Sequence, residues 1–226
     1  MTEEAMVTNR HPSAATLASY VAGKLGQAAG VAVAAHLLQC KRCLTVAATA
    51  EDDGRLLIGE LPLSPLASGA LQRTLNRIQL APAPPSIGLS PPPVMDLCRR
   101  AATMLGRLGW PTPQLRWVAP GVRVGVLLQE RCSRFGCETL FVLRVKPGVA
   151  LPSHSHVGLE LTCVLEGSFA DESGRYGIGD MAEAEDNVSH RPVAEGPADC
   201  ICLIATQGRL RFPGLLGRLV GTYLRI

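Results

Sequence analysis

Residues 148–167, with the sequence GVALPSHSHVGLELTCVLEG, carry three metal-ligand side chains between two glycines. His154 and His156 are separated by one residue, so on a β-strand both imidazoles point to the same face. Glu160 keeps that parity, and a glycine at either end suits a turn. The stretch therefore predicts a strand segment that delivers three ligands to one ion inside a small barrel.

The chain around this stretch has the pattern of an all-β domain. From Trp117 onward, short apolar runs alternate with glycines at the spacing of an antiparallel sandwich or barrel. A short helix is expected just before them, over 94–108. The predicted strands are VRVGVLLQE (122–130), ETLFVLRV (138–145), LELTCVLEG (159–167) and DCICLIAT (199–206).

A proline-rich segment, APAPPSIGLSPPP at residues 81–93, precedes this part of the chain. It contains six prolines and no charged residue, and such runs form extended spacers rather than packed elements. The sequence therefore predicts two domains, 1–80 and 94–226, on either side of a linker.

The N-terminal part has helical periodicity. Helices are expected over 13–23, 27–39 and, less regularly, 44–58, and a fourth begins at Ser64-Pro65, where a capping hydroxyl precedes a proline. An amphipathic stripe of this kind is either a core face or a docking face for a partner. The apolar residues on the fourth helix that are candidates for partner binding are Leu66, Leu71, Leu75 and Ile78.

A second metal-ligand motif, His36-x3-Cys40-x2-Cys43, lies in this helical part. On a helix, His36 and Cys40 face the same way, and a Cys-x2-Cys turn directs two thiolates to one ion. Tetrahedral zinc needs a fourth ligand, and His11 is the other histidine of this half. The alternative is two core cysteines and a surface histidine, but ligand type and spacing favour zinc. A closed site of this type would staple together a domain too small for a large core.

Composition excludes several classes of function. The 226 residues are 47% hydrophobic with a net charge of +3 and no basic block, so direct nucleic-acid binding is not expected. No apolar run reaches membrane-spanning length, and the N-terminus lacks the pattern of a signal peptide, so we expect a cytoplasmic protein. Its eight cysteines are then thiols or metal ligands. Cys200 and Cys202 share one face of a predicted strand and are candidates for oxidation, although buried cysteine is also an ordinary core residue.

The N-terminal half resembles the zinc-binding anti-sigma factor domains. The resemblance rests on HPSAATLASYVAGKL (11–25) and VAVAAHLLQCKRC (31–43), which hold an upstream histidine and the His-x3-Cys-x2-Cys motif. It implies that this part binds an extracytoplasmic-function sigma factor and covers its RNA-polymerase-binding surfaces. The helix near residues 65–78 then stands where the family has its fourth, sigma-contacting helix.

The C-terminal half is similar to the cupins. Residues 148–167 match the first cupin motif at every position, whereas the second motif is only partly present. Gly179 and His190 have its spacing, but proline, glycine and asparagine are replaced. The resemblance implies four metal ligands, and such a set suits zinc, manganese, iron(II) or nickel. The replacing residues are Glu185, Asn187 and Ala194, and the implied ligands are His154, His156, Glu160 and His190.

The combination resembles the ChrR-type anti-sigma factors. The expected fold is multidomain α and β, a small zinc-stapled helical domain followed by an antiparallel β cupin barrel. The resemblance implies zinc in both sites and a non-enzymatic negative regulator of transcription that answers singlet oxygen or related oxidative stress. Release of the partner by a reversible switch would require about 5.5 kcal/mol of differential binding, and proteolysis would not. The alternative is a metal-dependent cupin enzyme, a dioxygenase or isomerase with a docking domain, but no general base, substrate-binding arginine or aromatic platform is evident.

Overall fold

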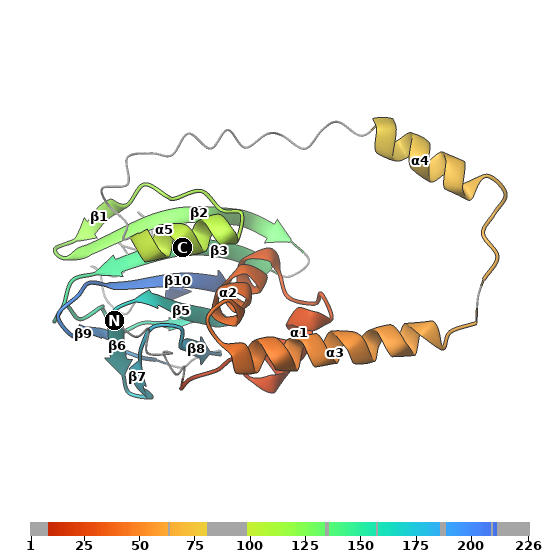
Figure 1. The fold of residues 1–226 in the computed structure, drawn as a ribbon. Helices are drawn as coiled ribbons and strands as arrows, with labels where there is room; N and C mark the ends of the chain where they lie inside the picture. Colours follow the sequence, from red (N-terminus) through yellow and green to blue (C-terminus); the bar gives the residue numbers. More distant parts are fainter. Residues whose placement is uncertain are drawn as a thin grey trace.

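The helices come first in the chain and the strands follow. The computed structural model describes residues 9–62, 64–80, 99–133, 136–156, 158–185, 189–208 and 210–211. In Figure 1, α1 and α2 lie against the barrel and the long α3 extends away from it. The predicted order of a helical part and an antiparallel cupin barrel is confirmed, while the linker 81–93 lies outside the described residues. The helices are α1 (Ala14–Val21), α2 (Gln27–Leu37), α3 (Lys41–Gly59), α4 (Ala70–Leu80) and α5 (Arg99–Arg107).

All named strand pairs are antiparallel, and six strands form the main sheet in the order β1-β2-β3-β10-β5-β8. These are β1 (Arg116–Ala119), β2 (Val122–Ser133), β3 (Gly136–Val145), β10 (Cys200–Gln207), β5 (Glu160–Glu166) and β8 (Met181–Ala184). A smaller sheet has the order β7-β6-β9, and β11 pairs with β4. These strands are β6 (Ser168–Asp171), β7 (Gly174–Tyr176), β9 (Val193–Glu195), β4 (Ser155–His156) and β11 (Leu210–Arg211).

Strand β10 shows why the central strands are apolar on both faces. Leu203 and Ala205 belong to a core shared with the helices, whereas Cys202 and Ile204 belong to the core inside the barrel. Successive side chains of a strand point to opposite faces, so covering both faces requires an unbroken apolar run. This arrangement explains why CICLIAT is hydrophobic at almost every position.

Helix α2 packs directly on the outer face of the main sheet, against β10, β5 and β3. Ala28, Ala32 and Val33 share one apolar cluster with Leu161 and Leu203 of the sheet. The small side chains of α2 let its backbone approach the sheet closely. Residues 1–80 and 94–226, predicted as two domains, therefore share a continuous core in the described part of the chain.

Helix α4 does not begin where the sequence predicts. Its first residue is Ala70, because Gly69 has φ of 73°, a left-handed conformation that an α-helix cannot include. The predicted start at Ser64-Pro65 is wrong, and Leu66 lies before the helix. Helix α3 likewise begins earlier than predicted, at Lys41, with Cys40 as its N-cap. Over the part of the chain that the structure describes, no helix has the length and apolarity needed to cross a membrane.

Candidate metal centres

The first centre lies where the segment before α1 meets the end of α2 and the start of α3. The His11 Nδ1 atom is 3.4 Å from both the Cys40 and the Cys43 sulfur, and the His11 and His36 rings meet edge to face. A Cys2His2 set is a closed tetrahedral site for zinc. The four residues named from the sequence have ligand atoms within 4.8 Å of one another: His11, His36, Cys40 and Cys43.

His36 shows most directly that this centre fits a cation. Its Nδ1–H donates a hydrogen bond of 2.7 Å to the Gly179 carbonyl, which fixes the ring and turns Nε2 toward the other ligands. That Nε2 atom is buried, and among the described residues it has no hydrogen-bond partner. An unpartnered buried nitrogen is costly unless an ion accepts its lone pair, so this observation supports a metal there.

The protonation states agree with this interpretation. Burial lowers the pKa of His36, so its imidazole is neutral and able to bind a metal at pH 7. Burial and the neighbouring Cys40 raise the pKa of Cys43 to about 11. The thiol would therefore stay protonated without a nearby cation, and a bound ion would convert it to the thiolate.

Side chains of the barrel, in β8 and directly before it, hold the segment that carries His11. Asp180 Oδ1 accepts hydrogen bonds from the backbone N–H groups of Asn9 (2.7 Å) and Arg10 (3.0 Å), directly before His11. Glu183 accepts hydrogen bonds from the backbone and hydroxyl of Ser13 and from a hydroxyl in α1. The ligand-bearing segment is thus fixed by side chains more than 160 positions away in the chain.

Glu138 of β3 holds the opposite end of α2. Helix α2 begins after Gly26 and has no side-chain cap of its own. Instead, the Glu138 carboxylate accepts hydrogen bonds from the Ala28 N–H (3.2 Å) and the Gln207 side chain (3.1 Å), and it is only 1% exposed. A carboxylate at a helix N-terminus satisfies free N–H groups and opposes the positive end of the dipole. Helix α2 is therefore bound to the barrel at both ends, at Glu138 and at Gly179.

The second centre lies inside the barrel and combines His154, Glu160 and His190, whose ligand atoms are within 4.8 Å of one another. His154 and His190 face each other across a β-bridge with Nε2 atoms 3.1 Å apart, and His190 Nε2 is 3.9 Å from a Glu160 oxygen. His156 lies in β4, but its side chain is outside the described residues, as is Asn187.

The two histidines of this centre are each oriented by a contact at Nδ1, the ring nitrogen that faces away from the ligand cluster. The Nδ1 atom of His154 is 2.9 Å from the Pro152 carbonyl, and that of His190 is 3.1 Å from the Asp171 carboxylate. Contacts of this type fix the ring so that Nε2 points to the ion. Burial lowers the pKa of His154 to about 4 and raises that of Glu160 to about 8. The pocket thus offers a neutral imidazole at His154, and a cation would bring Glu160 to its charged form.

Cys200 and Cys202, named from the sequence as possible redox thiols, lie beside this centre. Both are buried, with sulfur atoms 3.6 Å apart, and they line the same cavity as the second-centre ligands. The hydrogen bond with Cys200 and burial raise the pKa of Cys202 well above its usual range, so at neutral pH it is a thiol rather than a thiolate.

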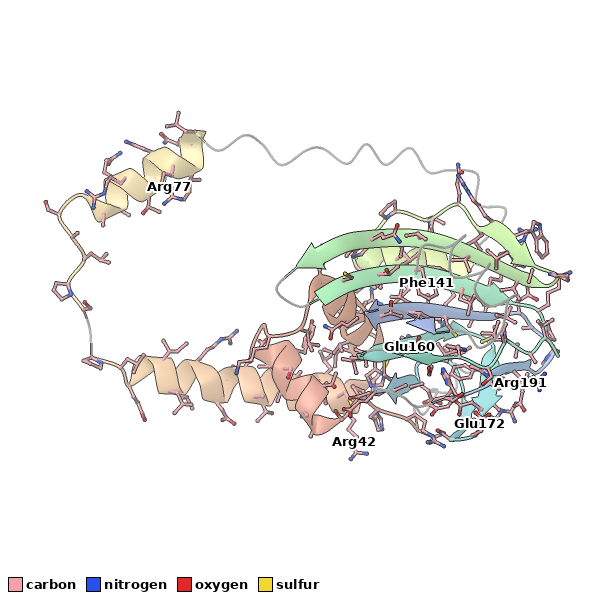
Figure 2. All side chains as sticks on the ribbon, turned by 180° about the vertical axis from the view of Figure 1, so that it is seen from behind. Arg42, Arg77, Phe141, Glu160, Glu172 and Arg191 are labelled. Carbon is pink, nitrogen blue, oxygen red and sulfur yellow. The ribbon has the colours of Figure 1, made fainter. Side chains whose placement is uncertain are left out.

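The candidate partner-binding residues all lie at the surface. Helix α4 has no buried residue, and Figure 2 shows Arg77 on this helix, away from the barrel. The exposed fractions are 82% for Leu66, 69% for Leu71, 42% for Leu75 and 66% for Ile78.

Sequence reasoning missed the residues that support the ligands. These are Glu138, Asp171, Asp180 and Glu183. Asp180 directly follows Gly179 of the second cupin motif, which was a local signal that something is held there. Glu138 offered none beyond being a charged residue at the start of an apolar strand.

Comparisons with known proteins agree with this architecture. Residues 107–209 match the family described as ChrR cupin-like domain. The anti-sigma-E factor ChrR of Cereibacter sphaeroides is 36% identical over 228 residues, covering 98% of this chain and all of that protein. A crystal structure of Rhodobacter sphaeroides SigE in complex with the anti-sigma ChrR matches with a TM-score of 0.70 and 32% identity, covering 89% of this chain and 100% of the matched chain.

Proposed function

This chain belongs to the ChrR family of anti-sigma factors, and from that premise we propose that it binds an extracytoplasmic-function sigma factor and blocks its access to RNA polymerase. The observation that carries the proposal is the match over 98% of the chain to an anti-sigma factor. It favours a regulator over the cupin enzyme. Such a regulator acts in the cytoplasm, where sigma factors meet the polymerase.

The exposed apolar residues of the helical part support the choice of binding surface. The end of α3 presents Leu56, Leu57 and Ile58, each more than 65% exposed, and α4 adds Leu71 and Ile78. In Figure 1, α3 extends away from the barrel and α4 lies apart from it. Soluble chains rarely expose apolar side chains in such number without a partner, and amphipathic helices commonly dock in an apolar groove. We assign residues 1–80 to sigma-factor binding and residues 94–226 to the barrel.

We further propose zinc as the ion of both centres. The thiolate-rich first set favours zinc by ligand type, and zinc there supplies a cross-link between α2, α3 and the segment before α1. His154, Glu160 and His190 would hold the second ion, with His156 as the fourth ligand. The side chains of the second centre position the ion and exclude water from it, while those of the first centre tie three segments together.

The two centres divide the work in this proposal. The first maintains the sigma-binding fold, and the barrel receives an oxidative signal, with Cys200 and Cys202 as candidate reactive thiols. The signal then weakens the complex, either by a reversible switch or by exposing the chain to proteolysis.

Co-expression with extracytoplasmic-function sigma factors of the same genome tests the proposal. We expect a one-to-one complex that survives size-exclusion chromatography, and a sigma factor that no longer binds core RNA polymerase in it. Elemental analysis should give two zinc ions per chain. A chain with intact helical content that captures none of these sigma factors would overturn the assignment.

A further inference from the structure

Among the four ligands proposed for the first centre, His11 depends most on the barrel for its position. The other three lie in α2 or at the start of α3, whereas His11 belongs to residues 9–13, which form neither helix nor strand. Besides the bonds to Asp180, the Arg10 carbonyl accepts a hydrogen bond of 3.1 Å from the Met181 N–H. The contacts that keep this segment on the barrel therefore also position His11.

The side chain of Arg10 joins this segment to the turn between β6 and β7. Its guanidinium donates a hydrogen bond of 2.8 Å to the Ser173 carbonyl and lies 5.0 Å from the centroid of the Tyr176 ring. A Cβ atom on residue 174 would overlap the guanidinium, and Gly174 leaves room for it. A hydrogen bond from a charged donor and a cation–π contact act together here, so two interactions connect Arg10 to the turn.

The same turn also contacts the second centre. One carboxylate oxygen of Asp171 lies 3.1 Å from His190 Nδ1, and the other accepts a hydrogen bond of 2.9 Å from the Ser173 N–H. Glu172 accepts a hydrogen bond of 3.0 Å from the Arg191 N–H, directly after His190. Figure 2 shows Glu172 and Arg191 close together on the barrel. The Asp171 side chain is only 4% exposed, so water competes little for its two bonds.

These contacts form a continuous path between the two centres, through His190, Asp171, Ser173, Arg10 and His11. We infer that Asp171 and Arg10 are positioning residues through which filling the second centre holds His11 in the first. When the second centre is filled, His190 is fixed and restrains Asp171, whose other oxygen sets the turn that receives Arg10. When it is empty, the turn is less restrained and His11 leaves the first centre more often. The inference rests on the proposed zinc binding at both centres, and it gives the barrel a route to the sigma-binding part.

Metal exchange at the first centre tests the inference. The purified full chain is loaded with cobalt(II) and mixed with excess zinc, which keeps the second centre filled. The sulfur-to-cobalt absorption bands report the first centre, because the second set of His154, Glu160 and His190 contains no thiol. We expect His154→Ala, which empties the second centre, to speed the loss of these bands about fivefold, a change equivalent to one hydrogen bond of ordinary strength. An unchanged rate would overturn the inference.

A double-mutant cycle tests whether the effect passes through Arg10. Arg10→Met removes the guanidinium and keeps the apolar stem, and in that background His154→Ala should cause no further acceleration. Arg175→Met makes the same substitution at an exposed arginine of the same hairpin, which pairs with Glu195, and it should keep the full response to His154→Ala. A response that persists in the Arg10→Met background, or that is lost equally in the Arg175→Met background, would overturn the role of Arg10.

Asp171→Ala tests the other end of the path and serves if His154→Ala fails to fold. It leaves every proposed ligand in place, and with excess zinc it should accelerate exchange about as much as His154→Ala. Asp171→Asn should recover part of the effect, because the amide oxygen still accepts the Ser173 N–H. Elemental analysis and sigma-factor capture by the unsubstituted chain test the proposed function separately. Fewer than two zinc ions per chain would contradict the zinc assignment, whereas two ions and an exchange rate that neither substitution changes would contradict the path alone.

Discussion

The two candidate metal centres combine similar side chains in different surroundings. The first draws its ligands from α2, the start of α3 and the segment before α1, and it includes two thiols. The second takes a carboxylate from β5 and two histidines from a β-bridge outside the named strands. The first is a closed set, whereas the second borders an apolar cavity. Ligand type alone therefore does not set the role of a centre, because the elements that it connects and the space beside it decide what its loss would do.

The two centres are structurally connected, because residues of the barrel hold the ligands of the first centre. The first centre is held by the barrel, through the Gly179 carbonyl on His36 and the Asp180 carboxylate on the segment before His11. Strand β8, which starts directly after Asp180, pairs with β5 so that Ala184 lies opposite Glu160 of the second centre. One strand pair thus connects the surroundings of both centres.

Loss of a ligand at the first centre should have the largest effect. Cys40→Ser removes a thiolate that also caps α3, and the free energy of structural zinc binding, on the order of 10 kcal/mol, exceeds the stability of so small a helical part. We expect loss of one zinc ion, much lower helical content by circular dichroism and no sigma-factor capture. Cys163→Ala, at a buried cysteine outside both centres, should cost about 1 kcal/mol and keep capture. Full sigma-factor capture by the Cys40→Ser variant would contradict a structural role for the first centre.

Loss of the Glu138 carboxylate should come next. Glu138→Ala leaves the N-terminus of α2 and the Gln207 amide without their acceptor, and we expect about 2–4 kcal/mol less free energy of unfolding in urea titrations. Glu138→Gln should recover part of it because the amide oxygen still accepts. The matched control is Glu195→Ala, whose ion pair with Arg175 is exposed and should contribute well under 1 kcal/mol. If the Glu138→Ala and Glu195→Ala variants were equally stable, the proposed stabilisation of α2 by the Glu138 carboxylate would be wrong.

Asp180 tests the support that the barrel gives to the first centre. Asp180→Ala removes the acceptor for the backbone N–H groups of Asn9 and Arg10, directly before His11. Because Asp180 does not contact a ligand atom, we expect zinc affinity to fall by about tenfold, the lower end of the range for groups that bond a ligand directly. Competition with a chelator of known affinity would measure this change at the first centre. Asp180→Asn keeps one acceptor oxygen and should lose less. An Asp180→Ala chain with unaltered zinc affinity would show that the barrel does not support that centre.

The smallest effect on partner binding is expected at the second centre. His154→Ala should lose the barrel ion and change sigma-factor affinity less than about twofold, because the barrel ion does not hold the sigma-binding helices. Metal content per chain, sigma-factor affinity and the stress response of a reporter strain check this together, with Ser153→Ala as the neighbouring control. Loss of sigma-factor binding by His154→Ala would contradict the proposed division of work.

Local spacing explains which parts could be predicted. The strand period places Cys200 beside Cys202. His36 and Cys40 were expected to share a helix, but α2 ends at Leu37 and Cys40 is the N-cap of α3, so the short turn between the two helices brings them together. The start of α4 was missed because the left-handed conformation of Gly69 outweighed the Ser64-Pro65 signal. Glu138 and Asp180 accept hydrogen bonds from backbone groups 110 and 171 positions away. Local periodicity in the sequence cannot predict contacts over such a separation.

The Glu138 carboxylate under the first turn of α2 also bears on how this chain can evolve. A Cβ atom on residue 26 would overlap that carboxylate, so Gly26 and Glu138 constrain each other across the two halves of the chain. In diverging relatives the two positions should change together, as contacting positions do. Recombination that joined these helices to a barrel from another lineage would break the pair. The helical part and the barrel are therefore expected to be inherited together, not exchanged as separate modules.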